Sequence, residues 1–149
     1  MHQLTPGDVV LFDSCLVSHL YTCNQRNDHE DRWWTVFDAI PRDRRMVNDI
    51  VRWELSRRPH REDAYSAYRW MESSFYSSEL KKGDLKEYRI IIASELDHRQ
   101  GFGGAADGLI AAHARKRDFV LATLNVRDFY NVQRLRLFVV SPREMQGGM

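Results

Sequence analysis

The sequence predicts an α/β fold with a mainly parallel central sheet. Short apolar runs with strand character alternate along the chain with longer segments whose apolar residues recur at helical spacing. The 149 residues, 43% apolar and 29% charged, have the composition of a globular protein and can bury a full core. We therefore expect one domain over residues 1–149, with residues 143–149 as a loose tail.

The first predicted elements are a buried strand and two helices. Residues 7–13, GDVVLFD, form a short apolar run after a Pro-Gly pair, which favours a strand. Residues 14–23 have helical periodicity, and either Asp13 or Ser14 can cap that helix. Residues 30–40 place four large apolar side chains at helical spacing before a proline, which predicts a second helix.

A second strand and a third helix follow. A short strand is expected near residues 46–47, and the next helix has Asn48 or Asp49 as its cap and Pro59 as its end.

Residues 61–83 predict another helix, because aromatic and apolar side chains share one stripe. The stripe consists of Tyr65, Tyr68, Met71 (or Glu72) and Phe75. We expect it to pack in the core or at a dimer contact rather than to stack RNA bases, and Gly83 is expected to break the run. Residues 84–101 are ambiguous, but the spacing of their apolar residues favours a helix.

The C-terminal third predicts a helix between two strands of the sheet. Residues 102–106, FGGAA, form a flexible entry to a helix at 106–117. Residues 118–123 and 135–142 are short apolar runs and are expected to be strands.

The two cysteines indicate a reducing compartment. If Cys15 and Cys23 lie on one helix, they are ~12 Å apart, beyond the ~7 Å that a disulfide spans. No apolar run approaches the roughly 18–20 residues of a membrane span, and the N-terminus lacks the features of a signal peptide. We therefore expect a cytoplasmic protein with no membrane contact.

Arginines are concentrated in residues 41–61, although the net charge of the chain is only +1. They are Arg42, Arg44, Arg45, Arg52, Arg57, Arg58 and Arg61. Against these seven stand three acids, so the local net charge is +4. The segment is either a face that binds a polyanion or an ordinary solvated face, and the sequence leaves both open.

Four acids from separate segments are placed to meet at one edge of the predicted sheet. They are Asp13, Glu54, Asp107 and Asp128. Ligand sites in such folds lie outside the carboxyl ends of the strands. Clustered carboxylates need a cation, and Mg²⁺ or Mn²⁺ prefers oxygen ligands. Such a site suits phosphodiester hydrolysis, with Arg52, Arg57 and Arg58 near Glu54 holding the substrate.

Each acid also has an ordinary structural explanation. An Asp at a strand end often caps a helix or a turn, and Glu54 can pair with Arg57 or Arg58 on its own helix. The six histidines and two cysteines are interpreted as forming no cluster with zinc-ligand spacing. His113 is expected to be a packed or surface residue, and NDHED at 27–31 a solvated loop and helix start.

Three segments resemble the PIN-domain family, specifically the toxin ribonucleases of VapBC-type toxin–antitoxin pairs. VLFDSCLVSHL is similar to the family's first strand and its Asp motif, and DIVRWELSRRP is similar to the segment with one central Glu. GGAADGLIAAHARKRDFVLATLNVRDF matches most specifically, and LRLFVVSP resembles the closing strand. The likeness covers roughly residues 8–20, 47–58 and 102–142.

The resemblance implies a PIN-like three-layer α/β/α sandwich that cleaves RNA with Mg²⁺ or Mn²⁺. It makes Asp13, Glu54, Asp107 and Asp128 the catalytic, metal-binding acids. The secondary polar groups would be Ser14, Thr123 and Asn125. Family toxins are usually homodimers that a cognate antitoxin blocks near the active site, so we expect both partners here.

Two residues depart from the family pattern. Cys15 stands where Asn is usual, which we expect to loosen the surroundings of Asp13, and Leu124 replaces a common Arg. Because no carboxylate is lost, activity is expected. Two alternatives stay open: an inactive PIN-like module for RNA binding or dimerisation, and a Mg²⁺-dependent phosphotransfer domain that uses Asp13.

Overall fold

A computed structural model of the protein describes residues 4–57, 61–94, 105–129 and 131–138. Its centre is a parallel sheet of five strands in the order β3-β2-β1-β4-β5. The strands are β1 (Val10–Phe12), β2 (Arg45–Asn48), β3 (Tyr76–Ser78), β4 (Val120–Ala122) and β5 (Arg136–Phe138). The prediction of an α/β fold with a parallel sheet is confirmed.

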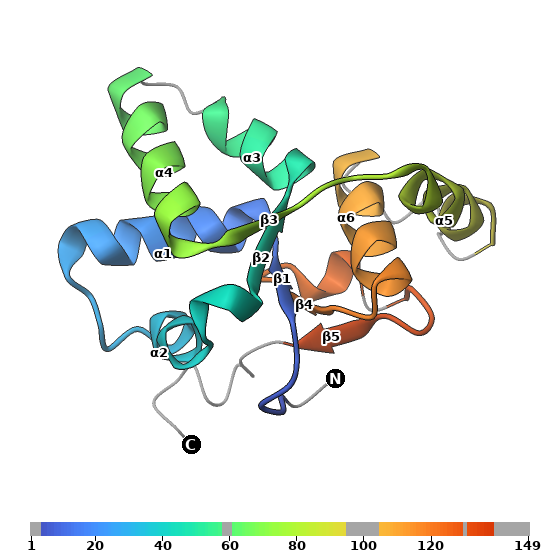
Figure 1. The fold of residues 1–149 in the computed structure, drawn as a ribbon, viewed down its shortest axis with the longest axis horizontal. Coiled ribbons are helices and arrows are strands. Elements are labelled where there is room, and N and C mark those ends of the chain that lie inside the picture. Colours follow the sequence, from blue (N-terminus) through green and yellow to red (C-terminus); the bar gives the residue numbers. More distant parts are fainter. Residues whose placement is uncertain (1–3, 58–60, 95–104, 130, 139–149) are drawn as a thin grey trace.

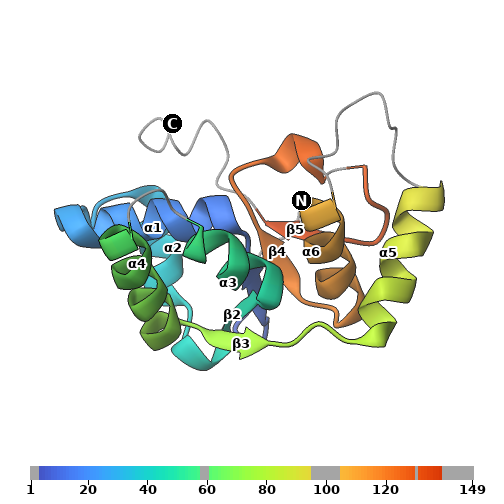
Figure 2. The same cartoon turned by 90° about the horizontal axis from the view of Figure 1, so that it is seen from above.

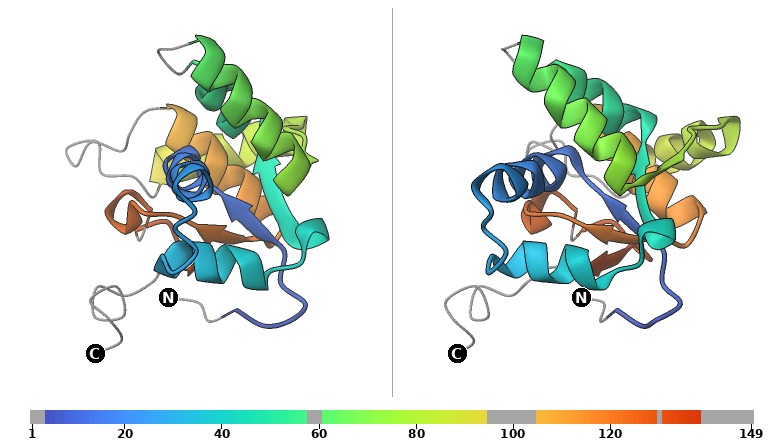
Figure 3. Two further views of the ribbon diagram at one scale, coloured as in Figure 1. Left: turned by 90° about the vertical axis from the view of Figure 1, so that its left-hand side faces the viewer. Right: turned by 60° about the vertical axis from the view of Figure 1, so that its left-hand side comes forward.

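Six α-helices accompany the sheet in the described part of the chain. They are α1 (Ser14–Arg26), α2 (Arg32–Ala39), α3 (Asp49–Ser56), α4 (Arg61–Ser74), α5 (Lys82–Ser94) and α6 (Ala105–Lys116). Helices α1, α2 and α4 lie on one side of the sheet, and α5 and α6 lie on the other (Figures 1 and 2). Figure 3 shows the first group in front of the strands. The layers are therefore α/β/α, as expected.

Both faces of the central strands are covered, which explains their continuous apolar sequence. All three residues of β1 and of β4 are buried, as in parallel sheets with helices on both faces. On the side of α1, α2 and α4, Phe12 makes edge-on ring contacts with Phe37 at 6.2 Å and with Phe75 at 5.1 Å. These aromatic contacts join the sheet to the end of α4 and to α2.

The opposite layer contains a buried polar network. Arg117 donates to Asp84, which also accepts from the backbone N–H of Lys81 at 2.7 Å. The ring of His113 is fully buried, with Nδ1 3.3 Å from Asp84 and Nε2 2.7 Å from the Ser78 hydroxyl. The network ties α5, α6 and β3 together, and His113 is a packed residue, as the sequence suggested.

The predicted aromatic stripe is confirmed in part. Met71 and Phe75 are buried in the core together with Ala64 and Ala67, whereas Tyr65 is 63% exposed, so its packing at a dimer contact stays a prediction. Small side chains at these buried positions allow α4 to pack closely against the core, and a large tyrosine there would not fit.

Gly83 does not break a helix, because α4 has already ended at Ser74 and Gly83 lies in the first turn of α5. Glycine is tolerated there because the first turn lacks a full set of internal hydrogen bonds. The intervening strand β3 was not predicted at all. The expected helix end at Pro59, the entry segment 102–104 and residues 139–142 lie outside the described residues.

No helix in the described ranges is both long and apolar enough to cross a membrane. Cys15 and Cys23 are free thiols, as the spacing argument predicted.

Candidate active site

Every strand pairing is parallel, so the carboxyl ends of the strands lie along one edge of the sheet. Asp13 directly follows β1 and caps α1, where its Oδ1 accepts from the backbone N–H of Leu16 at 2.9 Å. Thr123 directly follows β4, and its hydroxyl donates to the other carboxylate oxygen of Asp13. Because Phe12 is in register with Ala122, the next residues of both strands meet.

The Asp13 carboxyl is only 3% exposed, and its ionisation is disfavoured. Burial raises its pKa to about 6, against the lowering effect of its hydrogen bonds from Thr123 and Leu16. The charges of Glu54 and Asp128 raise it further, which places both acids near Asp13. A cation beside Asp13 would lower the pKa of this carboxyl again, because a positive charge favours the ionised carboxylate.

Glu54 reaches the same edge from α3. The hydroxyl of Ser14, the first residue of α1, donates to Glu54 Oε1 at 2.9 Å. This contact joins α1 to α3 across residues that are 40 positions apart in the sequence. Asn48 caps α3 by accepting from Val51 N–H at 3.1 Å, and it is fully buried where β2 ends. The cap therefore fixes where α3 begins relative to the sheet.

Asp107 and Asp128 are half-buried and come from the C-terminal third. Asp107 lies in the first turn of α6, where the helix dipole favours a negative charge. Asp128 ends a short 3₁₀ helix at Val126–Asp128. Burial and the charge of Asp13 raise the pKa of Cys15, with smaller contributions from Asp107 and Glu54. Cys15 thus lies among three of the four acids.

A polar loop follows β4 beside these acids. The backbone N–H of Asn125 donates to the Thr123 hydroxyl at 2.9 Å, and its side-chain amide donates to the sulfur of Cys15 at 3.5 Å. Thr123 therefore links Asn125 to Asp13. Leu124, between them in sequence, is exposed.

The structure thus brings together the elements that carry the four predicted acids, with Ser14, Thr123 and Asn125 among them. Among the described residues, no three of these acids place ligand atoms within 4.8 Å of one another. Separate oxygen donors of this kind fit a hard divalent cation that keeps some water ligands and also binds substrate phosphate. The residues present therefore fit Mg²⁺ or Mn²⁺.

The predicted substrate-binding arginines differ in their surroundings. Arg52 donates to the Tyr68 hydroxyl at 2.8 Å and lies 3.6 Å from Glu72 and 3.8 Å from Asp49. Its charge is therefore compensated within the protein. Arg57 lies over the ring of Trp53, 4.6 Å from its centroid. Arg58 lies outside the described residues.

Other arginines of the basic segment support the fold. Arg42 donates to backbone carbonyls at the end of α4, including that of Ser73 at 2.8 Å. Arg45 donates to the carbonyl of Ile40 at 2.8 Å and lies over the ring of Phe37. Two of the seven arginines therefore donate to backbone carbonyls at helix ends, and their charge is not part of a free basic surface.

The interpretation that histidines and cysteines form no ligand-spaced cluster is wrong. His19, Cys23 and Asp31 place one ligand atom each within 4.8 Å of one another. The helical i, i+4 spacing of His19 and Cys23 was a legible signal for two of them. Burial, followed by the charges of Asp31 and Asp28, raises the pKa of Cys23 to about 11. Burial alone would raise the pKa of Asp31, but hydrogen bonds from His19 and from backbone N–H groups hold it below its ordinary value.

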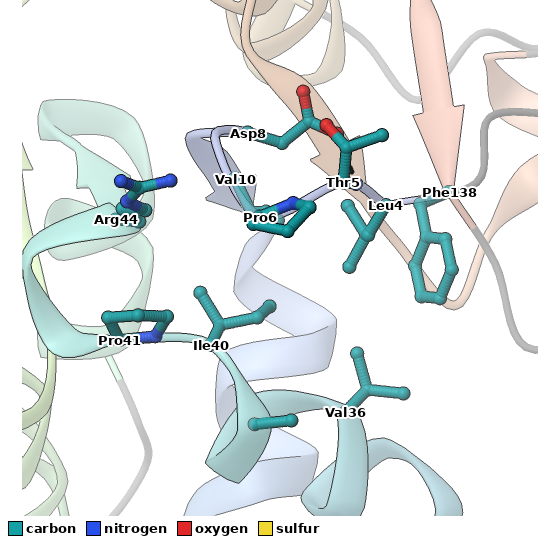
Figure 4. Close-up of a pocket in the computed structure, with 11 residues that line it drawn as sticks. Leu4, Thr5, Pro6, Asp8, Val10, Val36, Ile40, Pro41, Arg44 and Phe138 are labelled. Carbon is teal, nitrogen blue, oxygen red and sulfur yellow. Dashed lines mark hydrogen bonds between the residues drawn. The ribbon is translucent and has the colours of Figure 1, made fainter.

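The apolar cavity in Figure 4 is separate from the acidic edge. It has a volume of about 390 Å³ and is lined mainly by apolar side chains of the N-terminal segment, α2 and β5. Val10, the first residue of β1, lines it, so it lies toward the opposite end of that strand from Asp13. None of the four acids contributes to it.

The fold and this edge define a class: an α/β protein with acids from separate elements at the carboxyl ends of a parallel sheet. The PIN-domain family matches residues 10–135, so the chain belongs to the PIN-domain family. The resemblance found in the sequence is therefore confirmed. A comparison with curated protein sequences found no match.

Solved structures of toxin–antitoxin proteins have the same fold. VapBC-1 from nontypeable Haemophilus influenzae is 20% identical, with a TM-score of 0.66, covering 87% of this chain and 96% of that chain. FitAcB from Neisseria gonorrhoeae is 18% identical with a TM-score of 0.64, covering 87% and 96%. VapBC2 from Rickettsia felis, bound to promoter DNA, is 16% identical with a TM-score of 0.63, covering 89% and 98%. At these identities the likeness shows a shared fold.

Proposed function

We propose that this protein is a metal-dependent endoribonuclease and the toxin of a toxin–antitoxin pair. The observation that carries the proposal is the environment of Asp13 at the carboxyl edge of the sheet. A buried carboxyl with a pKa raised to about 6, near Glu54 and Asp128, is costly to the fold unless a cation binds there. PIN domains are generally nucleases, which is the chemistry that such a site suits.

Each acid has a distinct role in this proposal. Asp13 and Asp107 bind Mg²⁺ or Mn²⁺ directly, Asp128 binds it through water, and Glu54 binds the ion or orients the attacking water. A bound divalent cation supplies stabilisation of charge on the phosphate oxygens and a lowered pKa of water. The two oxygens of Asp13 already accept hydrogen bonds, so its orientation is set before an ion binds.

The secondary polar groups hold the acids in place. Ser14 donates to one oxygen of Glu54, which leaves the other carboxylate oxygen for an ion or a water molecule. Thr123 donates to Asp13 while accepting from Asn125, so the loop after β4 is tied to the first strand. Asn125 also contacts Cys15, which brings this loop against the first turn of α1.

The substrate surface proposed here is the outer face of α3 beside Glu54. Trp53 is 55% exposed, and the guanidinium of Arg57 lies over its ring. Exposed aromatic rings stack unpaired bases, and arginines contact phosphates. A depression of about 410 Å³ next to it is lined by Arg52, Trp53 and Tyr68, among others. Arg52 and Arg58 are also proposed to contact RNA.

A cognate antitoxin and a second copy of the chain are the proposed protein partners. The structural neighbours from Salmonella typhimurium and Klebsiella pneumoniae are described as a VapBC bound to DNA and as a toxin–antitoxin complex. By analogy, an antitoxin would cover the acidic edge of this chain. An RNA substrate and an antitoxin of this kind imply that the protein acts in the cytoplasm.

The test is cleavage of a mixed RNA pool by the purified chain with Mg²⁺, with Mn²⁺ or with EDTA. Asp107→Asn removes one proposed ligand and keeps the size of the side chain. We expect cleavage that needs the metal and falls at least about 100-fold in the variant, since each tenfold loss corresponds to ~1.4 kcal/mol of the barrier.

Asp118→Asn is the matched control. Asp118 is exposed at the opposite end of β4 and has positive φ, which Asn tolerates well. The Asp118→Asn variant should cleave RNA like the wild type. Equal cleavage by Asp107→Asn would refute the site, and no cleavage by a folded, metal-supplied wild type would favour an inactive RNA-binding module.

A further inference from the structure

A second cluster of ligand-type side chains lies between α1 and α2, away from the four acids. His19 and Cys23 are one turn apart on α1, and Asp31 is the residue that caps α2. His19 Nε2 is 2.9 Å from Asp31 Oδ2 and 3.6 Å from Cys23 Sγ. The loop between the two helices therefore returns the chain to α1 so that three different ligand types meet.

The three side chains converge as closely as a ligand set does. The ring nitrogen Nε2 faces both the carboxylate and the thiol, and the thiol of Cys23 also hydrogen-bonds Asp31, so each ligand atom lies near the other two. A tetrahedral zinc ion with its usual bond lengths of ~2.0 Å to nitrogen and ~2.3 Å to sulfur separates these two ligand atoms by ~3.6 Å. The observed separation between His19 Nε2 and Cys23 Sγ has this value. The 2.9 Å between Nε2 and Asp31 Oδ2 is a hydrogen-bond distance, and it would lengthen to ~3.3 Å around a tetrahedral zinc ion.

We propose that His19, Cys23 and Asp31 bind one zinc-type divalent cation through Nε2, Sγ and Oδ2, with water in the fourth position. Binding requires the thiolate of Cys23, so the thiol proton is released to solvent as the Zn–S bond forms. No oxidation or reduction accompanies this step.

The orientation of Asp31 is already set for such a role. Its other oxygen, Oδ1, accepts from the backbone N–H groups of Trp33 and Trp34 at 2.9 and 3.0 Å. These contacts leave Oδ2 pointing at His19. Hydrogen bonds of this kind commonly fix the ligands of metal sites.

The proposed site and the acidic edge differ in the ions that they prefer. Thiolate and imidazole select zinc and similar borderline ions, whereas carboxylates, with water and phosphate, suit Mg²⁺ or Mn²⁺. The new site would join the middle of α1 to the start of α2 and close the intervening loop, which stabilises the folded chain. Its occupancy does not depend on the proposed nuclease activity.

The test uses Co²⁺ as a spectroscopic substitute for Zn²⁺ on the full-length chain. We expect one equivalent of Co²⁺ to produce the near-ultraviolet thiolate-to-cobalt absorption, and Zn²⁺ to displace it. Cys23→Ser should abolish the band, and His19→Gln should weaken Co²⁺ binding at least about 10-fold. At ~100-fold excess over its Kd, Zn²⁺ should raise the Tm by about 5–10 °C in the wild type and not in Cys23→Ser.

Two control variants separate this site from the acidic edge. Cys15→Ser removes the other thiol, which lies among the acids, and Asp107→Asn alters the proposed nuclease site; both should keep the band. A band that Cys15→Ser removes, a band that survives Cys23→Ser, or no band in the wild type would each overturn the proposal. Because His19 is partly exposed, His19→Gln still tests it if Cys23→Ser fails to fold.

Discussion

The buried histidine of α6 makes the stability of this protein dependent on pH in a defined window. Burial, together with the nearby charge of Arg117, lowers the pKa of His113 to about 4, against the opposing effect of Asp84. In the unfolded chain the pKa returns to its ordinary value of about 6.5. The unfolded state therefore binds a proton between these two values while the folded state does not.

The sign of the effect follows from this difference. The stability contributed by neutral His113 is fully present above about pH 6.5 and is lost as the pH falls towards about 4. At pH 5 the difference in proton binding corresponds to a loss of roughly 2 kcal/mol. Asp13 acts in the opposite direction, because its raised pKa favours the folded state in acid. Since both proteins compared below keep Asp13, its contribution cancels.

The assay is urea unfolding of the wild type and of His113→Gln in EDTA, at about pH 7.5 and about pH 5. We expect the free energy of unfolding to fall by roughly 2 kcal/mol more in the wild type than in the variant between these two pH values. His29→Gln, which removes an exposed histidine, should behave like the wild type. If the free energy of unfolding falls by the same amount in the wild type and in His113→Gln between these two pH values, within about 0.5 kcal/mol, the reasoning is refuted.

Two further predictions concern the acidic edge and the start of α3. If Asp13 must be ionised to hold the ion, RNA cleavage at limiting Mg²⁺ falls as the pH decreases through about 6. Saturating Mg²⁺ should shift this fall to lower pH, and rates at two Mg²⁺ concentrations check it; a fall that ignores Mg²⁺ would contradict the role of Asp13. Asn48→Ala removes the acceptor for Val51 N–H and should destabilise the fold by about 1–2 kcal/mol in urea unfolding. A loss within experimental error would mean that this cap is dispensable.

Local signals in the sequence predicted most of the elements but not all of their boundaries. The first helix was expected to end at residue 23 and continues to Arg26, where Asn27 takes a left-handed conformation with φ of 53°. Asparagine is a recognised residue for such helix ends, so the longer helix was legible. Strand β3 could not be predicted from the sequence. This edge strand consists of Tyr76, Ser77 and Ser78, which show no alternation of buried apolar and exposed polar residues.

Three acids of the candidate site, Asp13, Asp107 and Asp128, could be proposed because strand ends and helix starts are readable locally. Glu54 lies in the last turn of α3 and was supported by the resemblance to the PIN-domain family. The cluster at His19 could not be completed in the same way, since Asp31 joins it only through the path of the loop after α1. The partners of His113 likewise come from residues 78 and 84, which no helical spacing connects to it. Contacts between residues that only tertiary packing brings together could not be predicted from local sequence patterns.

The departure at Cys15 has a smaller consequence than its position in the motif suggested. A thiol in place of the usual Asn was expected to loosen the surroundings of Asp13, yet both oxygens of Asp13 accept hydrogen bonds from Leu16 N–H and from Thr123. Neither donor depends on residue 15. What Cys15 does contact is Asn125, on the loop after β4. The substitution therefore bears on how that loop sits over the site, while the buried carboxylate keeps its orientation.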